Sequence, residues 1–176
     1  MTGPSGVGKG TLIRALLQRI PGLELAVSAT TRTPREGERN GIDYHFLSEA
    51  DFDCRVAAGE FVEHAVYAGN RYGTPRSELE RPAAGIVLEI DLQGARQVRE
   101  TLPEAKLIFI EPPSLEALEE RLRGRAADSP AQIERRLSAA RAELEAASEF
   151  DHRVVNDDLK RALGELTELV ATMSSP

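Results

Sequence analysis

The sequence predicts an α/β fold in which helices flank a doubly wound, mostly parallel β-sheet. Strand patterns alternate with helix patterns along much of the chain, which is typical of such sheets. Two apolar runs, residues 86–90 and 106–110, lack the polar–apolar alternation of a half-exposed strand, as expected for strands covered on both faces. A glycine-rich loop at residues 3–10 leads directly into a helix, an arrangement that binds phosphate. The length of 176 residues is that of one domain, with room for small appended lobes.

The first half of the chain combines helix patterns with short strands. An apolar stripe on one face predicts a helix near residues 10–18, which a Pro-Gly pair ends. Ser48 and Asp51 form a capping pair that opens a second helix. Short strands are predicted at residues 25–28, 44–46, 61–67 and 71–73, with a hairpin turn at residues 68–70. Residues 28–79 therefore form a small mixed lobe.

The second half continues the alternation of strands and helices. A helix is predicted between the two apolar runs, at about residues 94–102, and Gln93-Gly94 is interpreted as a tight exit from the preceding strand. The remaining predicted elements are a helix that Ser114 caps, a long helix that Asp128-Ser129-Pro130 opens, a strand at residues 152–155, and a closing helix that Asp157 or Asp158 caps.

Composition excludes several classes of function. The net charge of −7 argues against general nucleic-acid binding, so any positive charge that binds phosphate must be local. Cys54 is the single cysteine, which excludes a disulfide framework and a cysteine-based metal site. No apolar run approaches membrane-spanning length and no signal peptide is recognisable, so we expect a cytoplasmic protein without a membrane partner. Nothing in the sequence indicates an obligate protein partner.

The glycine-rich loop nearly matches the phosphate-binding pattern G-x-x-x-x-G-K-[ST]. Its glycines let successive backbone N–H groups converge on an anion, and Lys9 adds a charge for the outer phosphates of a nucleoside triphosphate. The departure from the pattern is Gly10, which stands where a Ser or Thr usually contacts Mg²⁺, and Thr11 follows it. A metal would then be held mainly by phosphate oxygens and water. The alternative interpretation is a glycine-rich turn before an ordinary helix.

A loop of this kind normally follows a buried strand, and only Met1 and Thr2 precede it here. We therefore expect the first core strand to be missing from the chain. Its absence would leave backbone groups of the neighbouring strands unpaired. The expectation at this point is that the natural start lies upstream, or that the 176-residue chain has impaired activity.

A second set of polar residues lies in the predicted small lobe. Arg32 and Arg35 flank a rigid proline, a good arrangement for two guanidinium groups around one phosphate, and Tyr44 can add a hydroxyl donor. A carboxylate such as that of Glu63 can accept two N–H bonds from an amidine edge, which guanine presents and adenine does not. The alternative is that these residues are solvated loop charges.

Four stretches together resemble guanylate kinase: residues 3–11, residues 28–35 with 41–44, the segment Leu-Glu-Ile-Asp-Leu-Gln-Gly at 88–94, and the arginine-rich segment before 135–137. The resemblance runs from Thr2 to about Leu169. It implies a P-loop NTPase-type parallel sheet flanked by helices, with a small mixed α/β GMP-binding lobe and a helical lid. It also implies that the γ-phosphoryl group of ATP is transferred to GMP, and to dGMP, with Mg²⁺ as cofactor. The implied divisions are a core at 1–27, 80–120 and 139–176, a GMP-binding lobe at 28–79 and a lid at 121–138.

The same resemblance implies a role for each matching residue. The implied catalytic residues are Lys9, Arg121, Arg125 and Arg136. The implied ATP-binding residues are Gly3, Pro4, Ser5, Gly6, Val7, Gly8, Lys9, Gly10, Thr11 and Asn156. For GMP they are Arg32, Arg35, Tyr44 and Tyr72 at the phosphate, Ser28, Glu63 and Thr74 at the guanine, and Glu89 and Asp91 near the Mg²⁺ water shell. No residue is expected to bind the metal directly, and Glu89 could instead be a strand residue paired with an arginine.

Two other functions remain alternatives. A non-catalytic guanylate-kinase-like interaction module would keep the GMP lobe and lack the ATP loop, so Gly8-Lys9 and the lid arginines argue against it. A P-loop kinase for another phosphorylated acceptor would not need the guanine-reading residues Ser28, Glu63 and Thr74.

Overall fold

The computed structural model describes residues 1–124 and 129–173. The chain divides into two compact units: Met1–Leu23 with Lys106–Pro176, and Glu24–Ala105. The second unit contains the lobe predicted at 28–79 together with the strand and helix that follow residue 79.

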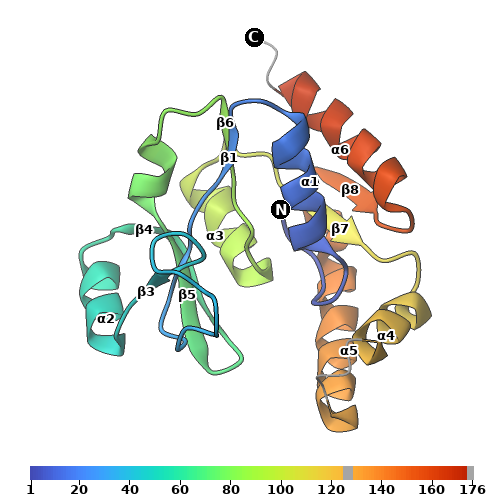
Figure 1. Cartoon of the computed structure of the whole chain (residues 1–176), viewed down its shortest axis with the longest axis horizontal. Coiled ribbons are helices and arrows are strands. Elements are labelled where there is room, and N and C mark those ends of the chain that lie inside the picture. The colour runs from blue at the N-terminus through green and yellow to red at the C-terminus, as the bar shows by residue number, and fades with distance from the viewer. Residues whose placement is uncertain (125–128, 174–176) are drawn as a thin grey trace. The chain divides into compact units, whose positions relative to one another are not determined.

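The first unit contains a parallel pair of strands, β7 (Ile108–Glu111) and β8 (His152–Val155), in which Ile108 lies opposite His152. Its helices are α1 (Lys9–Arg19), α4 (Leu115–Arg123), α5 (Pro130–Glu145), a 3₁₀ segment (Ala146–Glu149) and α6 (Leu159–Met173). Figure 1 shows α1 in blue beside α6 in red. This arrangement confirms the predicted parallel strands with helices packed on them.

Thr2 pairs with β7 on the edge that β8 leaves open. The Thr2 backbone N–H donates to the Ile108 carbonyl oxygen (2.9 Å), and the Ile110 N–H donates to the Thr2 carbonyl oxygen (2.8 Å). The result is an isolated parallel bridge between Thr2 and Phe109 rather than a strand. We expected the backbone groups of the neighbouring strands to be unpaired. For the Ile108 carbonyl and the Ile110 N–H of β7 this expectation is wrong, because Thr2 is the partner of both.

Apolar packing stabilises the first unit. Leu12, Ile13 and Leu16 are the buried face of α1, as the apolar stripe in the sequence predicts. An apolar cluster joins α4 to α5, and its members are Leu118, Leu122, Ile133, Leu137 and Ala140. Ser114 and Ser129 cap these two helices through their side chains, and Ser129 with Gln132 forms a capping box.

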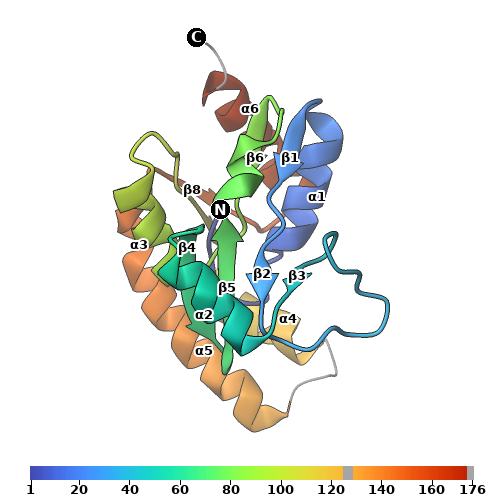
Figure 2. The same cartoon turned by 90° about the vertical axis from the view of Figure 1, so that its left-hand side faces the viewer.

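The second unit contains a four-stranded sheet with the order β3–β2–β5–β4. Its strands are β2 (Ala29–Thr30), β3 (His45–Phe46), β4 (Phe61–Tyr67) and β5 (Asn70–Pro75). β4 and β5 form an antiparallel hairpin, and α2 (Glu49–Ala57) lies in front of the sheet in Figure 2. Phe52 of α2 stacks on Phe61 with ring centroids 4.6 Å apart, which ties this helix to the sheet. A two-stranded sheet of β1 (Leu23–Leu25) and β6 (Gly85–Val87), a 3₁₀ segment (Arg76–Glu80) and α3 (Leu92–Thr101) complete the elements.

Three sequence predictions in this unit are wrong. The strand predicted at 25–28 is replaced by β1 and β2, because the Val27 N–H donates to the Glu78 carboxylate (2.9 Å) instead of to a strand. The strand predicted at 86–90 ends at Val87. Gln93-Gly94 is not a strand exit but the first turn of α3, which begins at Leu92 because the Asp91 side chain caps it.

Among the described residues, none of the helices combines the length and the apolar character needed to cross a membrane.

Gly3→Ala is expected to lower the free energy of unfolding by roughly 2 kcal/mol or more, because Gly3 has a φ of 147° and an added Cβ would lie 2.2 Å from the Ile110 carbonyl oxygen. Urea denaturation measures the effect. Gly164→Ala in α6 is the matched control, since its Cβ would meet no atom within 4 Å. The control is expected to stabilise the protein by about 0.5–1 kcal/mol. Equal stabilities for the two variants would contradict this account of the loop.

Candidate functional site

The N-terminal loop presents a helix start that suits an anion. Gly6 and Gly8 have φ values of 92° and 97°, conformations that side chains disfavour, and they turn the chain into α1. Gly8 is the N-cap residue of α1, where no side chain caps the helix, and the first turn of α1 contains no acidic residue. The backbone N–H groups and the positive end of the helix dipole are therefore not neutralised by a carboxylate of this turn.

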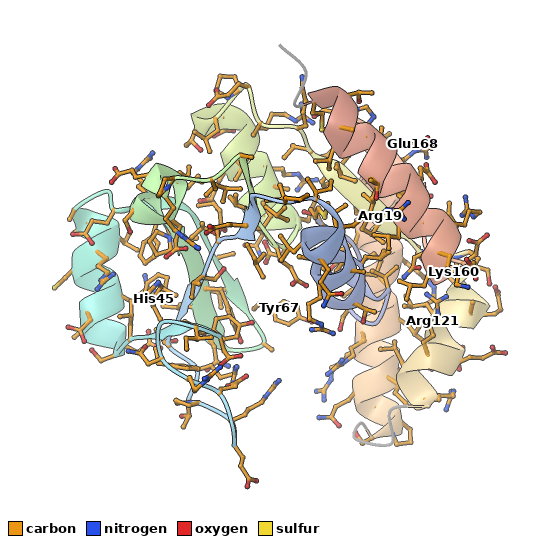
Figure 3. The ribbon with its side chains drawn as sticks, turned by 45° about the horizontal axis from the view of Figure 1, so that its top comes forward. Arg19, His45, Tyr67, Arg121, Lys160 and Glu168 are labelled. Carbon is orange, nitrogen blue, oxygen red and sulfur yellow. The ribbon has the colours of Figure 1, made fainter. Side chains whose placement is uncertain are left out.

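Cationic side chains contact this loop from three elements of the first unit. The Lys9 ammonium donates to the carbonyl oxygens of Gly3 and, at 3.4 Å, of Pro4. Arg121 of α4, labelled in Figure 3, donates to the Val7 carbonyl oxygen (3.3 Å). Arg136 of α5 donates to the Ser5 hydroxyl at 3.2 Å. Three of the four predicted catalytic residues thus lie against one loop, and Arg125 lies outside the described residues.

Asn156 also contacts this loop, and the sequence did not indicate that contact. Its backbone N–H donates to the Glu111 carbonyl oxygen (2.7 Å), which extends the β7–β8 ladder to the carboxyl ends of these strands. The Asn156 side-chain amide donates to the Val7 carbonyl oxygen (2.7 Å). The Asn156 backbone carbonyl oxygen accepts a bond from the Arg121 guanidinium (2.8 Å). An added Cβ on Gly8 would lie 2.6 Å from the Asn156 amide nitrogen, so the loop and this side chain are tightly packed.

In the second unit, the Arg32 guanidinium lies against the rings of Tyr44 and Phe46. It lies 5.3 Å from the centroid of the Tyr44 ring, and the Tyr44 and Tyr72 rings are 6.0 Å apart. Burial raises the pKa of the Tyr44 hydroxyl, with smaller contributions from Tyr72 and from the exposed Glu89, so this hydroxyl stays a proton donor at neutral pH. The structure therefore brings together three of the four residues predicted for the GMP phosphate, while Arg35 is exposed.

Glu38 links Arg32 to the backbone at Arg35, and the sequence did not lead us to expect this role. Its carboxylate accepts one bond from the Arg32 guanidinium (2.8 Å) and one from the Arg35 backbone N–H (2.7 Å). The bond from Arg32 lowers the pKa of Glu38 and raises that of Arg32. The available signal was an acidic residue three positions after Arg35 in a loop rich in turn formers, a spacing at which a side chain can cap the backbone of a turn.

A buried carboxylate lies on β4. Glu63 is 4% exposed and accepts a bond from the hydroxyl of Thr74, its cross-strand neighbour on β5, with 2.7 Å between the oxygens. Burial raises the pKa of Glu63, the bond from Thr74 opposes that shift, and the nearby charge of Asp91 adds to it. Of the predicted guanine residues, the structure joins Glu63 to Thr74, while Ser28 is half-buried and its carbonyl accepts a bond from the His45 N–H (2.9 Å).

The fold and these contacts define a nucleotide-binding protein of the P-loop class, and comparison with known proteins identifies the family. The family model for guanylate kinase matches residues 1–173. A guanylate kinase from Synechocystis sp. is 53% identical over 173 residues, which are 97% of this chain and 91% of the relative. One from Nostoc sp. is 57% identical over 166 residues, covering 93% and 83% of the two chains. The crystal structure of guanylate kinase from Anaplasma phagocytophilum superposes with a TM-score of 0.79 at 31% identity, covering 99% of this chain and 85% of that one.

The chain belongs to the guanylate kinase family. The resemblance stated from the four sequence motifs is thereby confirmed, and so is the fold class.

Glu63→Gln is expected to raise the free energy of unfolding near neutral pH by about 1 kcal/mol. The pKa of Glu63 is raised on folding, so the folded state binds the proton more tightly than the unfolded state, and the contribution of this residue to stability falls as the pH rises through the raised pKa. Urea denaturation at about pH 5 and pH 8 measures this slope, which glutamine should remove. Glu60→Gln, on the exposed turn before β4, is the control. A variant that is less stable than the wild type at pH 8 would contradict the prediction.

Proposed function

We propose that this protein transfers the γ-phosphoryl group of ATP to GMP, and to dGMP, giving ADP and GDP in purine nucleotide metabolism. The observation that supports a kinase over a binding module is the convergence of Lys9, Arg121 and Arg136 on the loop at residues 3–7. A module that only binds a partner has no need of three cations at an anion-binding helix start. Membership of the guanylate kinase family supports the same choice.

In the proposed mechanism, the first unit binds the triphosphate. The backbone N–H groups of residues 3–11, except Pro4, which has none, surround the phosphates. Lys9 exchanges its contacts with Gly3 and Pro4 for the outer phosphate oxygens. Arg121, Arg136 and, by family resemblance, Arg125 neutralise the charge that spreads over the transferring group. Asn156 holds the loop at Val7 and is also the proposed contact for the ATP base.

The second unit binds GMP in this proposal. Arg32, Arg35, Tyr44 and Tyr72 bind its phosphate, and Glu63 accepts the N1 and 2-amino hydrogens of guanine with Ser28 and Thr74 beside it. The attacking phosphate oxygen is already anionic, so no general base is needed. Closure of a lid at residues 121–138 over the core, with the lobe at 28–79 bringing GMP in line, would exclude water from the reaction.

The Asp91 carboxylate fits an Mg²⁺ ion that is held through phosphates and water. Within residues 1–124 and 129–173, His, Cys, Asp and Glu side chains form no group of three that could hold a metal ion. Asp91 directs one carboxylate oxygen to the Gly94 N–H (2.8 Å) as a helix cap, a partly buried position from which it can order metal-bound water. When bound, Mg²⁺ would neutralise and orient the β- and γ-phosphates.

Lys9→Ala is expected to lower turnover in an ATP and GMP assay by at least about a hundredfold, because it removes a cation that acts on the transferring phosphate. Lys160→Ala is the control, since Lys160 is an exposed lysine of α6 (Figure 3). Near-normal turnover of Lys9→Ala would refute the catalytic assignment of the loop.

Arg35→Ala is expected to raise the KM for GMP by about ten- to a hundredfold, the loss typical of a charge-assisted hydrogen bond to phosphate, with a smaller effect on kcat. Arg55→Ala on α2 provides the control.

The same assay with AMP and with a sugar phosphate in place of GMP separates the proposed activity from that of another P-loop kinase. Turnover with either compound at the GMP rate would count against the proposed acceptor.

A further inference from the structure

Gly94 occupies a position where the backbone does not require glycine. It lies in the first turn of α3 and is absent from the residues with positive φ. Glycine within a helix is less stable than alanine by roughly 0.5–1 kcal/mol. A buried helical glycine with ordinary backbone angles therefore points to a packing reason.

The packing reason is the carboxylate of Glu63. A Cβ on Gly94 would lie 2.3 Å from the Glu63 Oε2, closer than a real Cβ approaches another atom, and 3.0 Å from the Glu63 Cδ, which is a tight contact. It would also lie 3.3 Å from the Ile90 Cβ, which limits movement in that direction. Glycine at position 94 is thus what allows the Glu63 carboxylate to occupy its present place.

The helix cannot readily retreat from this contact, because hydrogen bonds tie α3 to β4 on both sides of Glu63. The Gln97 side chain accepts from the His64 N–H (3.0 Å) and donates to the His64 carbonyl oxygen (2.7 Å). The Thr101 hydroxyl shares its one hydrogen between the Val62 carbonyl oxygen of β4 (3.2 Å) and the Gln97 carbonyl oxygen of its own helix (2.9 Å). The Asp91 cap on the Gly94 N–H keeps the first turn of the helix formed. A side chain at position 94 would consequently displace the carboxylate rather than the helix.

We propose that Gly94 is a positioning residue for guanine specificity, because it leaves the space that orients the Glu63 carboxylate toward the acceptor base. This inference rests on the proposed function, in which Glu63 accepts two hydrogens from guanine. Displacing one carboxylate oxygen breaks the paired acceptor, and it does so without touching the phosphate-binding residues. The consequence should fall on the choice of base and leave the binding of ATP unchanged.

The experiment compares Gly94→Ala with the wild type in steady-state assays with GMP and with IMP, which lacks the 2-amino group. We expect the KM for GMP to rise about tenfold or more, with kcat and the KM for ATP within a few-fold of wild type, and the preference for GMP over IMP to fall. Gly164→Ala, which adds the same methyl group to an open position in α6, should behave as the wild type. A wild-type KM for GMP with an unchanged preference in Gly94→Ala would overturn the proposal.

A double-mutant cycle with Glu63→Gln separates this inference from the proposed function. If Gly94 acts through Glu63, adding Gly94→Ala to Glu63→Gln should cost little beyond the single glutamine substitution. Losses that multiply would overturn the inference and leave the role of Glu63 intact. If Glu63→Gln alone keeps the full preference for GMP, the assignment of Glu63 to guanine fails instead.

Unfolding measurements cover the case in which Gly94→Ala does not fold well. Glu63→Asp shortens the side chain by one methylene and withdraws the carboxylate from position 94. The destabilisation caused by Gly94→Ala should then be smaller in the Glu63→Asp background than in the wild type. An equal loss in both backgrounds would overturn the proposal, because the steric contact would not be with Glu63.

Discussion

The phosphate-binding loop depends on three glycines whose backbone lies so close to neighbouring residues that a side chain would not fit. Gly3 lies against the Ile110 carbonyl of β7, Gly6 against Leu122 of α4, and Gly8 against the Asn156 amide after β8. The loop is shaped by these contacts with the rest of the first unit as well as by its own sequence. An anion site of this kind needs N–H groups that are fixed before the ligand arrives, since reorganisation would cost binding energy.

The two units present their polar groups in different ways. In the first unit, cations from α1, α4 and α5 contact a loop whose helix start has no acidic cap. In the second unit, Glu38 orients the cation Arg32, and the buried carboxylate Glu63 depends on Thr74 and on the space at Gly94. Local arrangements of this kind allow a chain with a net charge of −7 to bind phosphate.

Much of the fold was predictable because the signals are local. The bounds of β4 and β8 agree with the predicted strands, and Ser48 and Ser114 cap helices as expected. Capping and hydrophobic periodicity act within a few residues, so one sequence displays them. The strand predicted at residues 25–28 was wrong because the Glu78 carboxylate takes the Val27 N–H, a backbone group that propensity alone would assign to a sheet. The strand predicted at residues 86–90 was too long, and the helix predicted from residue 94 began too late, because Asp91 caps α3 at Leu92.

The sequence by itself determined the family, the phosphate-binding loop and the residue types at the candidate site, because these depend on residue identity and spacing along the chain. Only the tertiary structure decided that Asn156 and Arg121 meet at Val7, that Glu38 holds Arg32, and that Gly94 makes room for Glu63. All but the Glu38 bond join residues more than thirty positions apart or on different elements. Their geometry follows from how helices and strands pack, a property that no local pattern encodes.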